Sequence, residues 1–430
     1  MSARAFGRFV ADARAAGRLV VQPRMGFGSP ERMRAGLTAT KRASATTVGT
    51  ITLDSYTRLG DHGAAGRALA AGADLNGYPI VAHDTGTTGA MLAGIVDETF
   101  PVQVRHGSPA PELIFRRLCD LGLTASEGGP VSYCLPYGRV PLAESRRSWQ
   151  RCCELLASAR ESGQEPHLET FGGCMLGQLC PPGLLVAVSL LEGMFFRQNG
   201  LRSVSLSYAQ QVSQGQDEEA LHALRRLAAR FLPDVDWHVV LYAYMGVYPR
   251  TVAGAAALLA EAARLAVRAG AERLIVKTAA ESARIPTITE NVAALEHAAR
   301  EAAAEGKGSE EVTETGIHAE ALAIVEAVLG LDGDVGKAME QAFHKGYLDI
   351  PYCLHPDNAG QASSYLDSDD RLQWRDTGRL PVAVPRHDSG GHLGAAELLD
   401  CLSRVRRRFD GFDQEPVEAP GAGAGWEVRR

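Results

Sequence analysis

The segment that decides the fold is residues 237–277, WHVVLYAYMGVYPRTVAGAAALLAEAARLAVRAGAERLIVK. It begins with Trp237–Leu241, a run rich in apolar residues with a high propensity for β-strands, and ends close to a second such run, Arg273–Val276. Between them, Thr251–Ala269 places apolar residues at three- and four-residue spacing, which is the pattern of an amphipathic helix. A strand, a helix and another strand in this order predict a βαβ unit of a parallel sheet.

The same alternation recurs from the start of the chain to about residue 277. Such a series of units favours the α/β class, and a closed (β/α)8 TIM barrel over an open sheet. Nine runs compete for the eight strand positions, and the pattern leaves open whether Pro79–Ala82 or Val131–Tyr133 is the extra one. The remaining candidates are Leu19–Val21, Thr47–Leu53, Val102–Val104, Leu168–Phe171, Ser203–Leu206 and the two runs quoted above.

The pattern changes after the last candidate strand. Helical segments are predicted over about Glu310–Leu329, Val335–Phe343 and Gly394–Arg408, and the stretch Asp349–Gly378 is rich in Gly, Pro and Asp. We therefore divide the chain into a barrel, residues 1–290, which carries the functional surface, and a mostly helical extension with a loose tail, residues 291–430.

Composition and charge exclude several classes of protein. The 430 residues include 44 Lys and Arg against 51 Asp and Glu, a net charge of −7, which disfavours nucleic acid as a partner. The most apolar stretch, Gly183–Phe196, is too short to span a membrane and carries Glu192, so a buried helix is expected. The 8 cysteines are scattered without a Cys-x-x-Cys pair, which predicts reduced thiols and a cytoplasmic location and gives no sign of a metal site.

Three arginines, Arg24, Arg58 and Arg105, follow the first, second and fourth candidate strands. The carboxyl ends of barrel strands carry the active site, and a guanidinium group binds a carboxylate through two parallel hydrogen bonds. If the three converge, an anion must neutralise them; a dicarboxylic or acidic amino acid suits them best, and a phosphorylated compound nearly as well. Arginines at loop starts are often structural, so spacing alone leaves convergence open.

Glu127 stands before two tyrosines, Tyr133 and Tyr137. A carboxylate beside two hydroxyl groups can hold a substrate ammonium group. The alternative is a Gly-rich turn in which Glu127 only caps the backbone.

Lys277 ends the last strand and Glu281 follows four residues later, a spacing at which the two side chains can pair. A buried lysine at a strand end suits Schiff-base chemistry. A lysine paired with Glu281 would stay protonated and donate hydrogen bonds, and we favour that role.

Taken in order, these motifs resemble the large (epsilon) subunit of glutamate mutase, an adenosylcobalamin-dependent methylaspartate mutase. The resemblance continues in register from about residue 20 to residue 360. It rests on Gln22–Gly26, Thr52–Arg58, Leu75–Pro79, Gln103–Gly107, Glu127–Tyr137, Phe171-Gly172, Pro181-Pro182, Met245-Gly246, Ile275–Thr278 with Glu281, Ile285–Thr287 and Asp349–Pro351.

The resemblance implies a barrel that converts L-glutamate to 3-methylaspartate, or the reverse, through radicals generated from adenosylcobalamin. Glu127, Lys277 and Glu281 would be its catalytic residues. The substrate would be bound by Arg24, Arg58, Arg105, His106, Glu127, Tyr133 and Tyr137. The cofactor would be contacted by Gly26, Asn76, Pro136, Phe171, Tyr248, Lys277, Glu281 and Ile285.

The resemblance also implies a partner, a small cobalamin-binding subunit that supplies the cobalt ligand from an Asp-x-His-x-x-Gly motif. The nearest match here, Asp236-Trp237-His238, has Leu241 where the motif requires glycine. We expect two copies of this chain within a heterotetramer. Two other functions remain open: a lyase or aldolase that uses Lys277 as a Schiff base, and a non-catalytic scaffold of a mutase.

Overall fold

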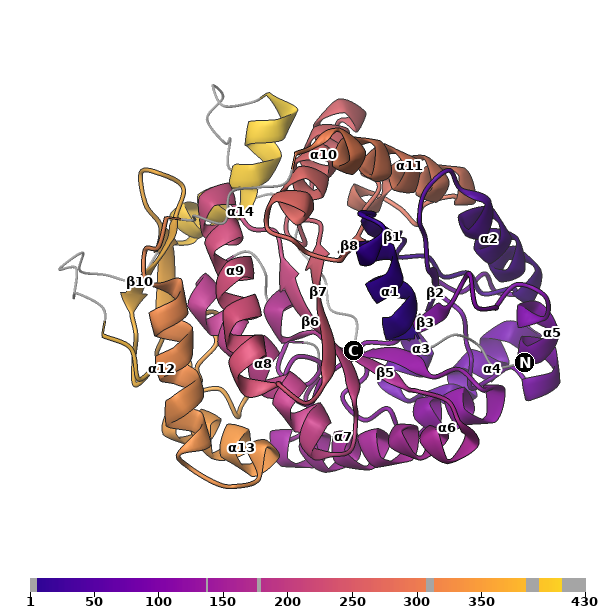
Figure 1. Ribbon diagram of the computed structural model, residues 1–430, viewed down its shortest axis with the longest axis horizontal. Helices are drawn as coiled ribbons and strands as arrows, with labels where there is room; N and C mark the ends of the chain where they lie inside the picture. Colours follow the sequence, from indigo (N-terminus) through magenta and orange to yellow (C-terminus); the bar gives the residue numbers. More distant parts are fainter. Residues whose placement is uncertain (1–5, 137, 176–178, 307–312, 384–393, 412–430) are drawn as a thin grey trace, which may run out of the picture.

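The computed structural model describes residues 6–136, 138–175, 179–306, 313–383 and 394–411. Its centre is a sheet of eight parallel strands in the order β1-β8-β7-β6-β5-β4-β3-β2. The edges β1 and β2 meet through a parallel bridge between Val21 and Thr47 and a hydrogen bond from Thr52 N to Met25 O (2.9 Å), so the sheet closes into a barrel (Figure 1). The strands are β1 Val20–Gln22, β2 Gly49–Thr52, β3 Val102–Arg105, β4 Ala125–Gly128, β5 His167–Thr170, β6 Ser203–Ala209, β7 Asp236–Tyr242 and β8 Arg273–Ile275.

The predicted (β/α)8 barrel is confirmed, but the assignment of one strand was wrong. Pro79–Ala82 and Val131–Tyr133 both lie in turns, and the fourth strand is Ala125–Gly128, which was not among the nine candidates. This strand has no β-branched residue; pairing with β3 and β5 on either side holds it extended in spite of its sequence. Val131 and Ser132 instead donate their N–H groups to the Glu192 side chain, which folds this segment into a turn.

Helices surround the barrel, and α1 closes its amino-terminal end. Apolar side chains of α1, such as Phe6 and Val10, pack with Val20 and Val48 at the start of β1 and just before β2. Helix α11 packs between α10 and α2 and completes the outer ring, so the predicted boundary at residue 290, which stays a prediction, falls within a barrel helix. The barrel helices are α1 Phe6–Ala15, α2 Pro30–Arg42, α3 Ser55–Leu59, α4 His62–Ala70, α5 Thr85–Leu92, α6 Glu112–Leu121, α7 Leu142–Ala157, α8 Pro182–Gln198, α9 Gln214–Phe231, α10 Val252–Arg268 and α11 Ile288–Ala304, with short 3-10 turns η1 Ser158–Ser162, η2 Gly172–Cys174 and η3 Ala279–Ser282.

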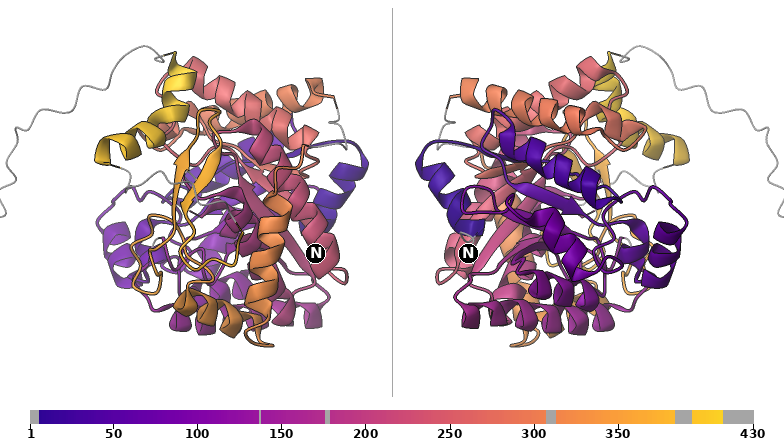
Figure 2. Two further views of the ribbon diagram at one scale, coloured as in Figure 1. Left: turned by 90° about the vertical axis from the view of Figure 1, so that its left-hand side faces the viewer. Right: turned by 90° about the vertical axis from the view of Figure 1, so that its right-hand side faces the viewer.

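The C-terminal part packs against the side of the barrel. Helices α12 (Ile317–Leu329) and α13 (Val335–Lys345) cover α8, and α14 (Ala395–Asp410) lies against α10. Between them an antiparallel hairpin, β9 (Ser363–Leu366) and β10 (Leu372–Asp376), forms in the Gly/Pro/Asp-rich stretch, where no strand was expected. Figure 2 shows the hairpin and α12 on one side of the molecule.

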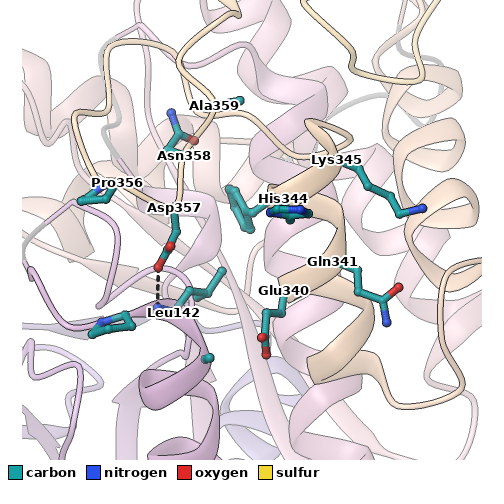
Figure 3. Close-up of a pocket in the computed structure, with 12 residues that line it drawn as sticks. Leu142, Glu340, Gln341, His344, Lys345, Pro356, Asp357, Asn358 and Ala359 are labelled. Atoms are coloured by element: carbon teal, nitrogen blue, oxygen red, sulfur yellow. Dashed lines mark hydrogen bonds between the residues drawn. The ribbon is translucent and has the colours of Figure 1, made fainter.

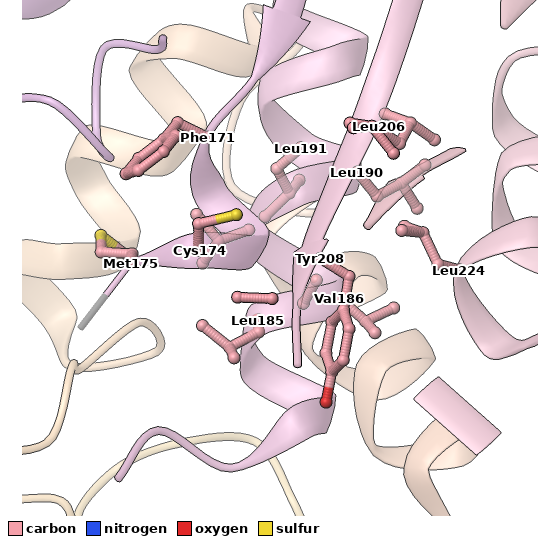
Figure 4. Close-up of a cluster of buried hydrophobic side chains, with 14 of the residues drawn as sticks. Phe171, Cys174, Met175, Leu185, Val186, Leu190, Leu191, Leu206, Tyr208 and Leu224 are labelled. Carbon is pink, nitrogen blue, oxygen red and sulfur yellow. The ribbon is translucent and has the colours of Figure 1, made fainter. Parts of the chain in front are cut away.

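Because α8 is enclosed by the barrel on one face and by α12 and α13 on the other, nearly all of its residues are buried. Its apolar side chains belong to one cluster with those of β6 and of the turn after β5, and Figure 4 shows Leu190 beside Leu206. No helix within the described ranges combines the length and the hydrophobicity needed to cross a membrane.

Candidate functional site

The three arginines lie at the carboxyl ends of the first three strands and line one cavity of about 130 Å³. Arg24 follows β1, Arg58 belongs to α3 after β2, and Arg105 is the last residue of β3. Their convergence follows from barrel closure, which brings the ends of neighbouring strands together. The other residues around the cavity are Thr52, His106, Gly107, Glu127, Tyr133, Phe171 and Met245.

Arg58 is presented by a very short helix that is capped at both ends. The buried Asp54 carboxylate accepts hydrogen bonds from Tyr56 N (2.9 Å) and Thr57 N (3.1 Å), and Gly60 ends the helix in a left-handed conformation (φ 77°). Gly107, also left-handed at φ 66°, passes beside the Arg58 side chain. These local constraints fix where the guanidinium group lies.

Glu127 on β4 is 1% exposed and lies between the Arg105 guanidinium group and the hydroxyl groups of Tyr133 and Tyr242. Its Oε2 is 3.3 Å from Arg105 Nη2, and Tyr133 donates a hydrogen bond to its Oε1. Burial raises the pKa of Glu127 above its ordinary value, although Arg105 opposes the shift. Burial alone would lower the pKa of Arg105, but Glu127 raises it, so Arg105 remains a cation.

His106 is buried beside Arg105 and is neutral. Burial and the charges of Arg58 and Arg105 lower the pKa of His106 to about 3. Its Nδ1 accepts a hydrogen bond from Ser108 N (3.0 Å), which places the ring proton on Nε2. The ring packs within 5.3–5.8 Å of the ring centroids of Phe115, Tyr133 and Trp149, so its direction is fixed.

Several buried polar atoms at the cavity have no hydrogen-bond partner within the described part of the chain. They are Thr52 Oγ1, Arg58 Nε and Arg105 Nη1. Buried polar groups in native proteins are normally paired, so these atoms are available to a bound molecule. Three guanidinium groups against one carboxylate make the cavity suited to a small compound with carboxylates and one ammonium group.

A second hollow of about 590 Å³, which we call the groove, adjoins the arginine cavity and shares Arg24 and Thr52 with it. Its wall is formed by the residues after β1 and β8, which are neighbours in the closed barrel. It collects most of the predicted cofactor-facing residues: Gly26, Asn76, Lys277, Glu281 and Ile285.

The predicted pairing of Lys277 with Glu281 is not what the structure has. Glu281 caps the start of η3 by accepting a hydrogen bond from Thr278 N (3.2 Å). It also accepts a hydrogen bond from Arg24 Nη1 (3.1 Å). Lys277 is 7% exposed, and its Nζ lies 4.3 Å from the centroid of the Tyr248 ring. Burial lowers the pKa of Lys277 to about 8, with Glu281 opposing the shift.

The remaining predicted residues lie in different places. Phe171 lines the arginine cavity, and Pro136 lines a separate hollow beside Tyr352 and Leu354. Gly26 is required by close packing, since a Cβ atom there would lie 2.2 Å from Thr52 O. Tyr137 lies outside the described residues.

Sequence reasoning missed Glu192, a residue of α8 that supports two loops of the site. Its carboxylate is fully buried and accepts five hydrogen bonds, from Val131 N, Ser132 N and Oγ, Phe171 N and Gly172 N. These loops carry Tyr133 and Phe171. The available signal is a lone charge in the apolar stretch Gly183–Phe196, which predicts a buried helix but not the loops that its carboxylate binds.

His238, the only histidine in the near match to the cobalt-binding motif, is committed elsewhere. It is 6% exposed, stacks on His167 (ring centroids 5.1 Å apart) and contacts Arg273 Nη2 at 3.3 Å. Burial and Arg273 hold the pKa of His238 well below its ordinary value. It belongs to the barrel interior.

A further hollow of about 620 Å³ lies between the start of α7, α13 and residues 356–359 (Figure 3). Asp357 caps α7 by accepting a hydrogen bond from Leu142 N (2.7 Å), and Glu340 pairs with Arg146 (2.8 Å). His344 and Lys345 are exposed. Its described polar groups are therefore paired or exposed, which gives no sign of a ligand.

Comparison with known proteins identifies the family to which the chain belongs. Residues 2–389 match the family model described as methylaspartate mutase E chain (MutE). The chain is 29% identical over 373 residues to the glutamate mutase epsilon subunit of Escherichia coli O157:H7, covering 82% of this chain and 76% of that protein. It is 31% identical over 347 residues to the glutamate mutase epsilon subunit of Halobacterium salinarum, covering 75% of this chain and 70% of that protein.

Among solved structures, the spore coat polysaccharide biosynthesis protein spsE of Bacillus subtilis is similar at 10% identity and a TM-score of 0.38, covering 85% of this chain and 86% of that one. This likeness is too weak to carry an argument. The family match spans nearly the whole barrel and extension, so the chain belongs to the methylaspartate mutase E chain family, whose named relatives are epsilon subunits of glutamate mutase.

Proposed function

We propose that this chain is the catalytic subunit of an adenosylcobalamin-dependent mutase that interconverts L-glutamate and 3-methylaspartate. The observation that carries the proposal is the convergence of Arg24, Arg58 and Arg105, with Glu127, on one cavity of about 130 Å³. A cavity of this size and charge suits a small amino dicarboxylic acid.

In this proposal the arginines bind the two substrate carboxylates, and Glu127 binds the ammonium group. The unpartnered Nη1 of Arg105 and Nε of Arg58 supply donors without any rearrangement of the protein. Because the arginines would hold both carboxylates at once, they would also retain the two fragments of a cleaved carbon skeleton until these recombine.

The second hollow fits the nucleoside part of the cofactor. Lys277 and Glu281 place a hydrogen-bond donor and an acceptor on one wall, a pair suited to the two hydroxyl groups of a ribose, and the half-exposed Ile285 adds an apolar contact. When bound, adenosylcobalamin supplies a carbon-centred radical by homolysis of its cobalt–carbon bond. The chain's own part is to bind and orient the substrate beside this groove and to exclude water.

The cobalt ligand is proposed to come from a small cobalamin-binding partner, within a heterotetramer containing two copies of this chain. The commitment of His238 to the barrel interior supports a ligand from another chain. A cytoplasmic location is proposed as well, and the eight cysteines, all free thiols, suit a reducing compartment.

Turnover by the assembled enzyme tests the proposal. The chain, its small subunit, adenosylcobalamin and L-glutamate are expected to give 3-methylaspartate only when all are present. Arg105→Ala should abolish product while assembly of the two subunits persists. Assembly without turnover in the unaltered enzyme, or full turnover by Arg105→Ala, would favour a scaffold instead.

A second candidate is a Schiff-base lyase or aldolase that uses Lys277. The burial of this lysine and its pKa of about 8 favour that chemistry. Against it, Lys277 is not among the residues that line the arginine cavity. Borohydride trapping of a carbonyl substrate on Lys277, lost in Lys277→Met, would support the lyase and contradict the mutase.

A further inference from the structure

The interior of the barrel beneath the arginine cavity is filled by hydrogen-bonded polar side chains. Arg273 on β8 is fully buried, forms an ion pair with Glu169 on β5 and donates a hydrogen bond to Ser205 Oγ (3.0 Å). Glu169 also accepts hydrogen bonds from Gln103 Nε2 and Ser205 Oγ, each at 3.1 Å. Burial alone would raise the pKa of Glu169, but Arg273 lowers it, so this carboxylate is ionised and held in place.

Tyr242, the last residue of β7, connects this polar layer to the cavity. Its side chain is fully buried, and its hydroxyl group donates to Glu169 and lies 3.3 Å from Glu127 Oε2. The face of its ring lies 5.0 Å from Arg105 Cζ. Tyr242 is not among the residues that line the cavity, yet it contacts both members of the Arg105–Glu127 pair.

We propose that Tyr242 is a positioning residue: anchored by the Glu169–Arg273 pair, it holds Glu127 against Arg105 so that Glu127 meets the substrate as a carboxylate. This inference rests on the proposed function for the identity of the substrate. Its physical basis is that a carboxylate in a dry site stays charged only if donors and cations surround it. Arg273 serves the same purpose for Glu169, which therefore stays ionised and accepts the hydrogen bond that anchors Tyr242.

The groups that face Glu127 come from five elements. They are Arg105 from β3, Tyr133 from the turn after β4, Glu169 from β5, Tyr242 from β7 and Arg24 from the segment after β1. Burial raises the pKa of Glu127, and the charge of Arg105 and the hydrogen bond from Tyr133 counteract that shift by stabilising the charged form. The Tyr242 hydroxyl shares its one proton between Glu169 and Glu127 and acts on Glu127 in the same direction. Removing the Tyr242 hydroxyl should therefore make Glu127 easier to protonate.

The test compares Tyr242→Phe, which keeps the ring over Arg105, with Tyr208→Phe as a matched control. Tyr208 on β6 is equally buried and donates to a buried carboxylate, Asp217 Oδ1 (2.9 Å), but neither residue lines the cavity or the groove. The first measurement follows, by infrared spectroscopy against pH, the carboxylate band that Glu127→Gln removes. The second measures glutamate binding to the complex with the small subunit.

In Tyr242→Phe the Glu127 band should titrate about one pH unit higher than in the unaltered protein, equivalent to one lost hydrogen bond, and glutamate should bind about tenfold more weakly. Tyr208→Phe should change neither quantity. An unchanged titration in Tyr242→Phe, or an equal shift in Tyr208→Phe, overturns the positioning role. A shifted titration in a protein that binds no glutamate supports the positioning role and overturns the proposed substrate instead.

Discussion

Arg24 Nη1 and Glu281 Oε2 lie 3.1 Å apart and join the segment after β1 to the turn after β8. Arg24 borders both the arginine cavity and the adjoining groove, whereas Glu281 borders only the groove. The ion pair is therefore part of the wall between the proposed substrate and cofactor sites. It gives each site a direct physical connection to the other.

Loss of this ion pair should weaken both sites together. In Glu281→Gln, Arg24 loses its charged partner, and we expect the KM for glutamate to rise and the affinity for adenosylcobalamin to fall, each by about tenfold. Steady-state kinetics and cofactor titration of the assembled enzyme measure the two effects. Ile285→Ala, which trims a half-exposed side chain that borders only the groove, should affect the cofactor alone; an unchanged glutamate KM in Glu281→Gln would contradict the connection.

The protonation of Lys277 should make cofactor binding dependent on pH. Its pKa is lowered by burial to about 8, so the ammonium group is present below this pH and is lost above it. If Lys277 donates to the cofactor, affinity should fall by about tenfold per pH unit above that value. Cofactor titration of the complex measures the trend, which should be absent in Lys277→Met. A Schiff-base enzyme would behave in the opposite way, because its amine becomes nucleophilic as the proton leaves.

Buried neutral histidines should make the fold sensitive to acid. Burial lowers the pKa of His106 and of His167 to about 3, against 6.5 for the unfolded chain. Between these values the unfolded state binds more protons, so this contribution to stability is complete above pH 6.5 and is lost as the pH falls, by up to about 1.4 kcal/mol per pH unit for each histidine.

Glu192 has the opposite effect on the pH dependence of the unfolding free energy, because burial raises its pKa to about 7. Comparing a histidine variant with the unaltered chain separates the contribution of the histidine from that of Glu192. Urea unfolding of His167→Gln against pH should have a slope smaller by about 1.4 kcal/mol per pH unit than that of the unaltered chain. The exposed His344 serves as the control, and His344→Gln should leave the slope unchanged.

Glu192 should matter to activity as well as stability, because it supports the loops that carry Tyr133 and Phe171. An amide has one acceptor oxygen where the carboxylate has two, so Glu192→Gln leaves buried N–H groups unpaired and should cost about 2–3 kcal/mol of unfolding free energy. Glutamate KM should rise about tenfold or more, measured in the assembled enzyme.

Glu219→Gln provides the matched control for this prediction. Glu219 is also buried and accepts hydrogen bonds from Thr315 N (2.8 Å), Gly316 N (3.1 Å) and Ile317 N (3.0 Å) at the start of α12, away from the cavity. It should lose similar stability without a change in KM. If both variants alter KM equally, the effect is one of general stability.

The barrel could be predicted because its signal is local. Apolar runs and helical periodicity repeat along the chain, and seven of the eight strands coincide with such runs. Ala125–Gly128 could not be predicted, because its extended form depends on two neighbouring strands. The hairpin of β9 and β10 was missed for a related reason: its sequence is dominated by turn residues, and Gln216 of α9 holds it through hydrogen bonds to both backbone groups of Leu372 (2.7 and 3.0 Å).

The sequence by itself determined the class of fold and the kinds of residue at the strand ends, since both depend on the order of residues along the chain. Only the tertiary structure decided which of them meet. Arg24 and Glu281 are 257 positions apart, and Tyr242 lies 115 positions from Glu127; closure of the sheet brings each pair together. The expected pair of Lys277 and Glu281 does not form, because Glu281 caps η3 and binds Arg24 instead. No local pattern carries this information, because it arises when β1 and β8 become neighbours.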